Sequence, residues 1–137
     1  MTYAYSAPAA ARPWTLAHRP EAADQARQIA KECLTRWRVT DEVTDSVLLT
    51  VSELVTNAVQ HAQPPLTVGL DCDPTVGYVH IEVSDGGPAA PGDDLQSSLP
   101  DDEHGRGLMI VECLTAGHGK RQEPGHAVHW ADISTAA

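Results

Sequence analysis

The segment Ser84-Asp85-Gly86-Gly87-Pro88 could recognise a flat heterocyclic ring, because it follows an apolar run at the end of a predicted strand. The carboxylate of Asp85 can accept a hydrogen bond from the exocyclic amine of such a ring. A residue without a side chain beside it lets the ring lie against the backbone. An ordinary turn, which Asp-Gly-Gly often forms, is the alternative interpretation.

The segment His104-Gly105-Arg106-Gly107-Leu108 could bind an anion. Its glycines lead from a polar loop into a predicted helix, and the unpaired N–H groups and the dipole at a helix start favour negative charge. A loop hinge at Gly105 with close packing at Gly107 is the alternative. For a phosphate ligand such a helix end would matter, because 19 Asp and Glu against 9 Lys and Arg give the chain a net charge of −10.

Glu53, Asn57 and His61 form a polar stripe on a predicted helix. They are spaced at i, i+4 and i+8, so each is offset by about 40° from the one before. The stripe borders the apolar arc of the helix rather than opposing it, which places it beside the core. A solvated edge with one i, i+4 hydrogen bond is the alternative.

The elements that would position these residues follow from periodicity and turn signals. Apolar residues at helical spacing predict a helix from Pro20 to about Trp37 and a longer one after the capping residues Thr40 and Asp41. Alternating patterns predict strands separated by Pro and Gly turns. The expected elements are a strand at 14–16, helices at 20–37 and 42–62, a hairpin of strands at 66–72 and 78–85, a long loop at 86–104, a short helix at 108–114, and strands at 117–122 and 126–133.

Composition predicts one domain in a reducing compartment. The 137 residues suffice for a single core, with residues 1–12 as a loose leader and 13–137 as the domain. Three widely spaced cysteines without a CxxC pair, and no apolar run of membrane-spanning length, predict a cytoplasmic protein with reduced thiols. The acidic charge disfavours nucleic acid and anionic membranes as partners, and the histidines and cysteines lack zinc-site spacing.

The order of these motifs closely resembles the GHKL family of ATP-binding domains, also known as the Bergerat fold. A helix with ELVTNAVQHA, two strands ending in Asp-Gly-Gly, an acidic loop and Gly-Arg-Gly-Leu opening a helix cover about residues 13–133. The chain is most similar to short members related to bacterial anti-sigma factor serine kinases. The implied fold is α+β: a two-layer sandwich with a mixed, mainly antiparallel sheet and three helices on one face.

The resemblance implies a role for each motif residue. Asn57 corresponds to the asparagine that helps to bind Mg²⁺, and Glu53 to the acid thought to activate the attacking hydroxyl or water. Asp85 corresponds to the adenine-reading aspartate, with Gly87 beside it. The remaining implied nucleotide contacts are His61, Gly105, Arg106 and Gly107. A metal ligand, an acid one turn away and an anion-binding helix end suffice for phosphoryl transfer, which depends on positioning and charge neutralisation.

The function implied is an ATP- and Mg²⁺-dependent cytoplasmic regulator that acts by partner switching. It would hold a sigma factor or similar target and phosphorylate a serine on a small antagonist protein. The alternative is a module that regulates a partner by binding alone. That alternative is favoured by Gly125-His126-Ala127, which stands where many relatives have a Gly-Lys-Thr-like segment. The sequence leaves open whether the chain forms a homodimer.

Overall fold

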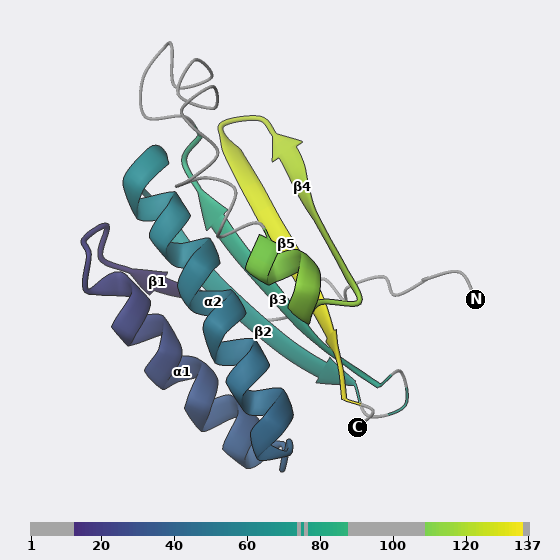
Figure 1. The fold of residues 1–137 in the computed structure, drawn as a ribbon. Coiled ribbons are helices and arrows are strands. Elements are labelled where there is room, and N and C mark those ends of the chain that lie inside the picture. The colour runs from purple at the N-terminus through teal and green to yellow at the C-terminus, as the bar shows by residue number, and fades with distance from the viewer. Residues whose placement is uncertain (1–12, 74, 76, 88–108, 136–137) are drawn as a thin grey trace.

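In a computed structural model, residues 13–73, 75, 77–87 and 109–135 are described, and they form five strands and three helices (Figure 1). The elements are β1 (Trp14–Leu16), α1 (Ala22–Arg36), α2 (Asp41–His61), β2 (Leu66–Asp73), β3 (Tyr78–Asp85), β4 (Gly117–Glu123), β5 (His126–Ser134) and a short helix at residues 109–114. The predicted leader at 1–12 and most of the predicted loop at 86–104 lie outside the described residues.

The five strands form one open sheet in the order β1-β2-β3-β5-β4. All four pairings between the described strands are antiparallel, so the predicted hairpin of β2 and β3 is confirmed and the sheet is antiparallel throughout. β5, the last strand of the chain, lies between β3 and β4. This order brings the end of β3 next to the start of β5, where Asp85 pairs with Ala127.

The helices cover one face of the sheet, as the resemblance implies. α1 packs over β1 and β2, while α2 crosses β3 and β5 (Figure 1). The helix at 109–114 contributes the buried Val111 to the same hydrophobic core. Along the described residues no helix lies on the opposite face, so the fold is a two-layer α+β sandwich with one open sheet face.

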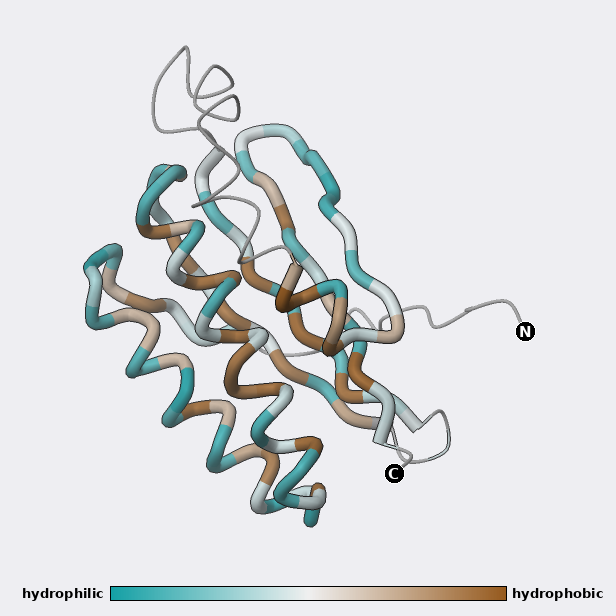
Figure 2. The backbone as a smooth tube through the Cα atoms, in the orientation of Figure 1, coloured by the Kyte–Doolittle hydropathy of each residue, from teal (hydrophilic) through white to brown (hydrophobic). Residues whose placement is uncertain are grey.

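α2 forms where the sequence predicts it. The hydroxyl of its N-cap Thr40 accepts a hydrogen bond from the backbone N–H of Val43 at 3.3 Å, which satisfies one of the four unpaired donors at the helix start. Its apolar side faces the sheet and α1, as the hydrophobic stretches on the inner side of α2 show in Figure 2. The helix ends at His61, shortly before Pro64 and Pro65.

Two further predictions concern the cysteines and membrane-spanning segments. All three cysteines are free thiols, with Cys33 buried and Cys113 exposed. Each helix in the described ranges is too short or too polar to span a lipid bilayer.

Candidate functional site

Asp85 is a buried carboxylate at the end of β3, with its side chain only 3% exposed. Its Oδ1 atom accepts a hydrogen bond from the backbone N–H of Gly87 at 2.8 Å. This short loop fixes the plane of the carboxylate and leaves Oδ2 as the oxygen for another partner. A charged acceptor removed from water needs such partners, because an unpaired one is costly.

Gly86 and Gly87 are both required beside Asp85, for different reasons. At Gly86 a Cβ atom would overlap the carbonyl oxygen of Pro64 and lie 2.9 Å from that of Gln63. At Gly87 the backbone has φ +93°, which disfavours other residues, and within the described part of the chain no atom lies within 4 Å of where a Cβ would be. Sequence reasoning assigned Gly87 to the ligand and missed the packing role of Gly86, although the Gly-Gly pair signals a close backbone approach.

The end of α2 is fastened directly to this segment. The Gly86 N–H donates to the Gln63 carbonyl at 2.6 Å, and the Gln63 N–H donates to the Gly87 carbonyl at 2.8 Å. Nε2 of His18 lies 2.7 Å from the carbonyl oxygen of Ala62, the C-cap residue of α2. The last turn of α2 and the Asp-Gly-Gly segment therefore form one rigid corner.

The stripe predicted on α2 lies on the side of the helix turned away from α1. Ser52 marks the α1 side, because its hydroxyl accepts a hydrogen bond from Nη1 of Arg27 at 3.4 Å. Glu53, Asn57 and His61 lie roughly 100°, 140° and 180° around the helix from Ser52. All three are half-buried. Since α2 crosses β3 and β5, the stripe faces the β5 and β4 side of the sheet.

The structure thus brings the stripe and Asp85 to one side of the core. His61, the last residue of α2, is two residues from Gln63 and so lies at the Asp85 corner. Asn57 and Glu53 follow at about 6 Å and 12 Å along the helix axis. Gly105, Arg106 and Gly107, predicted to complete the phosphate end, lie outside the described residues.

Two residues of the neighbouring strands join this side of the sheet and were missed as site residues. Directly paired residues share a face, so the pairings of Val83 with His129 and of His129 with Lys120 place both on the face that carries Asp85. Nε2 of His129 lies 3.7 Å from Oδ2 of Asp85. Sequence reasoning considered Arg106 the strong cation of the site, because the strand register that aligns Lys120 is invisible in the sequence.

Burial lowers the pKa of His129, and the positive charge of Lys120 acts in the same direction, while Asp85 opposes both. The net direction favours the neutral imidazole near pH 7. The side of the sheet near Asp85 therefore carries a cationic Lys120 and an uncharged, titratable His129.

His126 points to the opposite face of the sheet. Its Nε2 pairs with Glu123 at 2.7 Å, and its cross-strand position is on the open side. Ala127, the next residue, shares the face of Asp85 and pairs with it across the strands. Within the segment Gly125-His126-Ala127, the residue that faces Asp85 is consequently the small Ala127 and not the ionisable His126.

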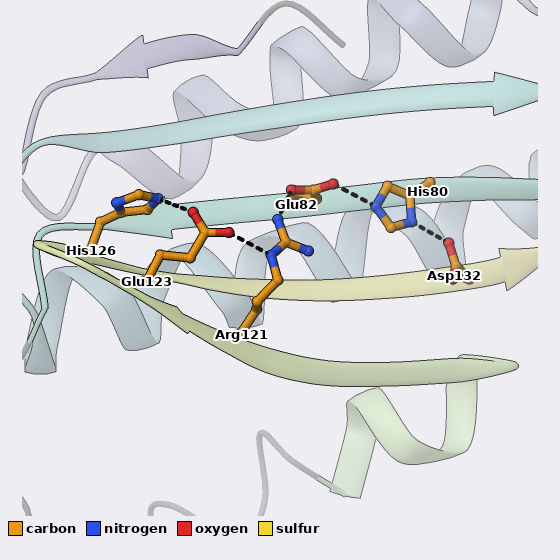
Figure 3. Close-up of polar contacts among 6 residues, drawn as sticks. All are labelled: His80, Glu82, Arg121, Glu123, His126 and Asp132. Atoms are coloured by element: carbon orange, nitrogen blue, oxygen red, sulfur yellow. Dashed lines mark hydrogen bonds and ion pairs between the residues drawn. The ribbon is translucent and has the colours of Figure 1, made fainter. Parts of the chain in front are cut away.

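A second polar cluster occupies the open face and is separate from this site (Figure 3). It is a chain of contacts between alternating acids and bases. In order, its members are Asp132, His80, Glu82, Arg121, Glu123 and His126.

The inner end of this cluster is buried. Nδ1 of His80 contacts Oδ1 of Asp132, and its Nε2 lies 2.9 Å from Oε2 of Glu82. The His80 contact lowers the pKa of Glu82, whereas burial raises the pKa of Asp132 to about 7. Trp130 stacks on the His80 ring with centroids 6.3 Å apart. Among the described residues Oδ2 of Asp132 has no hydrogen-bond partner, and the other contacts join side chains of neighbouring strands, so we interpret the cluster as structural.

Mg²⁺ suits the donors of the α2 stripe. The amide oxygen of Asn57 is a hard ligand, and Mg²⁺ commonly takes one or two protein oxygens while phosphates and water complete its shell. Within the described ranges there is no group of three His, Cys, Asp or Glu residues arranged to hold a metal by themselves. An open cavity of about 600 Å³ lies along α1 and is lined by none of the predicted site residues.

Comparison with known proteins places these features in context. The family model described as histidine kinase-like ATPase domain matches residues 16–128. No curated protein matches the chain.

Several solved structures share the fold, and three of them are described here. The RsbU and RsbW domains of Rv1364c from Mycobacterium tuberculosis align with a TM-score of 0.69 at 20% identity over 93% of this chain, which spans 33% of that longer chain. The SiaB-SiaC complex from Pseudomonas aeruginosa aligns with a TM-score of 0.59 at 10% identity, covering 89% of this chain and 88% of that one. The Acinetobacter baumannii histidine kinase AdeS aligns at 0.50 and 13% identity, over 93% and 70%.

Proposed function

The chain belongs to the histidine kinase-like ATPase domain family, and from this premise we propose that it binds ATP with Asp85 as the reader of the adenine ring. The observation that carries the proposal is the geometry of that carboxylate. Oδ1 is held by the Gly87 N–H, Oδ2 lies 3.7 Å from Nε2 of His129, and no atom of the described residues lies within 4 Å of where a Cβ of Gly87 would be. An exocyclic amine would donate to Oδ2 while its ring lies along the glycine backbone.

The phosphates would extend from Asp85 along the free side of α2. In this proposal Asn57 holds Mg²⁺, which when bound would offset the charge of the phosphates. Glu53, one turn further along the helix, would accept the proton of an attacking hydroxyl. His61 would lie near the nucleotide. The backbone of Gly105 and Gly107 and the side chain of Arg106 would contact the phosphates.

We further propose that the protein is a cytoplasmic regulator of the anti-sigma factor type. It would switch between partner proteins and transfer the γ-phosphoryl group of ATP to a serine of an antagonist. The fold neighbour from Pseudomonas aeruginosa was solved as a complex of two proteins, SiaB and SiaC, which supports regulation through a partner. A sigma factor, or the antagonist itself, is the partner expected.

The first experiment measures nucleotide binding. Asp85→Asn is expected to weaken ATP binding about 5- to 150-fold, because a buried hydrogen-bonding partner is lost at a cost of roughly 1 to 3 kcal/mol. Asp45→Asn is the matched control, because it is the same substitution at an exposed position on α2. Equal affinity in both variants would refute the assigned role of Asp85.

A second experiment tests transfer. Purified protein is incubated with labelled ATP, Mg²⁺ and a candidate antagonist, and the wild type is compared with Glu53→Gln and with Glu42→Gln, an exposed glutamate on the same helix. Transfer that is lost only in Glu53→Gln supports the kinase. Transfer that persists in Glu53→Gln contradicts the role of Glu53.

The competing function is regulation by binding alone, and one observation favours it. Ala127 faces Asp85 across the strands and offers no hydroxyl where relatives carry a Gly-Lys-Thr-like segment. ATP binding with no labelled product for any antagonist, together with tight binding of the partner, would support this function over the kinase.

A further inference from the structure

Oδ2 of Asp85 has a second neighbour besides the proposed ligand, and that neighbour is His129. The distance from Oδ2 to Nε2 of His129 is 3.7 Å, which is too long for a hydrogen bond but short for a pair of opposite charges. Asp85 is 3% exposed, whereas His129 is 33% exposed and so remains in exchange with solvent protons. The oxygen that the proposed function assigns to the adenine amine therefore already has an imidazole beside it.

The charge state of His129 decides how strongly it competes. A neutral imidazole at this distance leaves Oδ2 available, whereas an imidazolium would be drawn into a charge-assisted hydrogen bond. Asp85 on β3 and Lys120 on β4 are the charged groups that act on His129 from the neighbouring strands, and the α2 stripe with Glu53 and His61 faces the same side of the sheet. Of these, Asp85 favours the protonated form and Lys120 the neutral form, and burial adds to the effect of Lys120.

We propose that His129 is a positioning residue that makes nucleotide binding proton-dependent: neutral His129 leaves Asp85 Oδ2 to the exocyclic amine of the base, and protonated His129 occupies it. This inference rests on the proposed function, because it names a control on the same adenine-reading carboxylate. The register between β3 and β5 brings the two side chains together, because His129 pairs with Val83, which lies two residues before Asp85 on the same face.

The proposal predicts a defined linkage between protons and nucleotide. A ligand that binds only the form with neutral His129 has an apparent affinity reduced by the fraction of protein in that form. Below the His129 midpoint that fraction falls tenfold per pH unit, so the apparent dissociation constant rises up to about tenfold per unit. Binding near the midpoint releases a proton from His129.

The test compares ATP affinity from pH 5.5 to 8.5 in the wild type, His129→Gln and His126→Gln. His126 is the matched control because it lies on the same strand, faces the opposite side and pairs with Glu123. The titration of the ATP phosphates cancels in the ratio of dissociation constants between two proteins at one pH. The wild type and His126→Gln should weaken relative to His129→Gln as the pH falls below the His129 midpoint.

A second measurement needs no variant. The ring signals of His129 are titrated by NMR in the wild type with and without ADP, and nucleotide should lower the midpoint of His129. A pH-independent affinity ratio, or an unmoved midpoint in a protein that binds nucleotide, overturns this inference and leaves the proposed function standing. A wild type that binds no nucleotide at any pH overturns both.

Discussion

Replacing Gly86 by alanine tests whether the corner between α2 and β3 is as rigid as its contacts indicate. The added methyl group would overlap the Pro64 carbonyl oxygen and crowd that of Gln63, both of which are backbone atoms. Because a backbone cannot swing aside as a side chain can, the Asp-Gly-Gly segment and the end of α2 must separate. That movement breaks the two hydrogen bonds that join Gln63 to Gly86 and Gly87.

The expected cost follows from these contacts. Overpacking costs about 1 to 3 kcal/mol, and each lost backbone hydrogen bond adds about 0.5 to 1.5 kcal/mol. Alanine restricts the unfolded chain and returns about 0.4 to 1 kcal/mol. With two hydrogen bonds lost, the free energy of unfolding should therefore fall by about 1 to 6 kcal/mol, which for a domain of this size lowers Tm by roughly 4 °C per kcal/mol.

Thermal and urea unfolding of Gly86→Ala, followed by circular dichroism, measures this loss. Gly125→Ala is the control, since Gly125 has φ +79° and no atom within 4 Å of an added Cβ, so only backbone strain of about 1 kcal/mol is expected there. If Gly86→Ala is no less stable than Gly125→Ala, the corner is not held by the contacts described. Gly86→Ala should also weaken ATP binding, because Asp85 moves with the segment.

Three further predictions concern other parts of the fold. Burial raises the pKa of Asp132 to about 7 from 3.8, so the native state holds a proton that the unfolded chain has already released between those values. As the pH rises across that window, the free energy of unfolding of the wild type relative to that of Asp132→Asn should fall by at most about 1.4 kcal/mol per pH unit. Urea titrations of both proteins at pH 5 and pH 8 measure this, and the same stability difference between them at both pH values would contradict it. The exposed Cys113 should react with a thiol reagent far faster than Cys33, because Cys33 is buried and burial raises its pKa. Mass spectrometry of the labelled protein measures the order, and faster labelling of Cys33 would contradict the prediction. Thr40→Ala should lower the free energy of unfolding in urea by about 1 kcal/mol, because the N–H of Val43 loses its acceptor. An unchanged urea midpoint would contradict the role of Thr40 as the N-cap.

The helices and strands could be predicted from the sequence because each has a strong local signal. Thr40 precedes the apolar arc of α2, and alternation marks β3 and β5, so the structure confirms these elements within one or two residues. The family resemblance is likewise confirmed by the match over residues 16–128. These features depend on residues that are near one another in the chain or on motifs in a fixed order.

The missed site residues depend on strand register, which no local signal encodes. Lys120 and His129 reach the side of Asp85 only because β5 pairs with both β3 and β4 in the observed alignment. A shift of one residue would move every side chain of β5 to the other face. In that register His126 would lie on the ligand side and His129 on the open face, reversing the roles that the structure assigns.

The same strand register gives the acidic residues on the two faces of the sheet different roles. On the helix side Asp85 retains an oxygen for a ligand, because its neighbour His129 stands off at 3.7 Å. On the open side Glu82 contacts both His80 and Arg121, while Asp132 contacts His80 through Oδ1 and burial raises its pKa to about 7. A chain with a net charge of −10 can present an unsatisfied carboxylate to an anionic nucleotide only if its other nearby acids are neutralised or turned away. The cluster on the open face accomplishes both for β3 and β5, and it leaves Lys120 as the charged residue of the inner β4 and β5 surface beside Asp85.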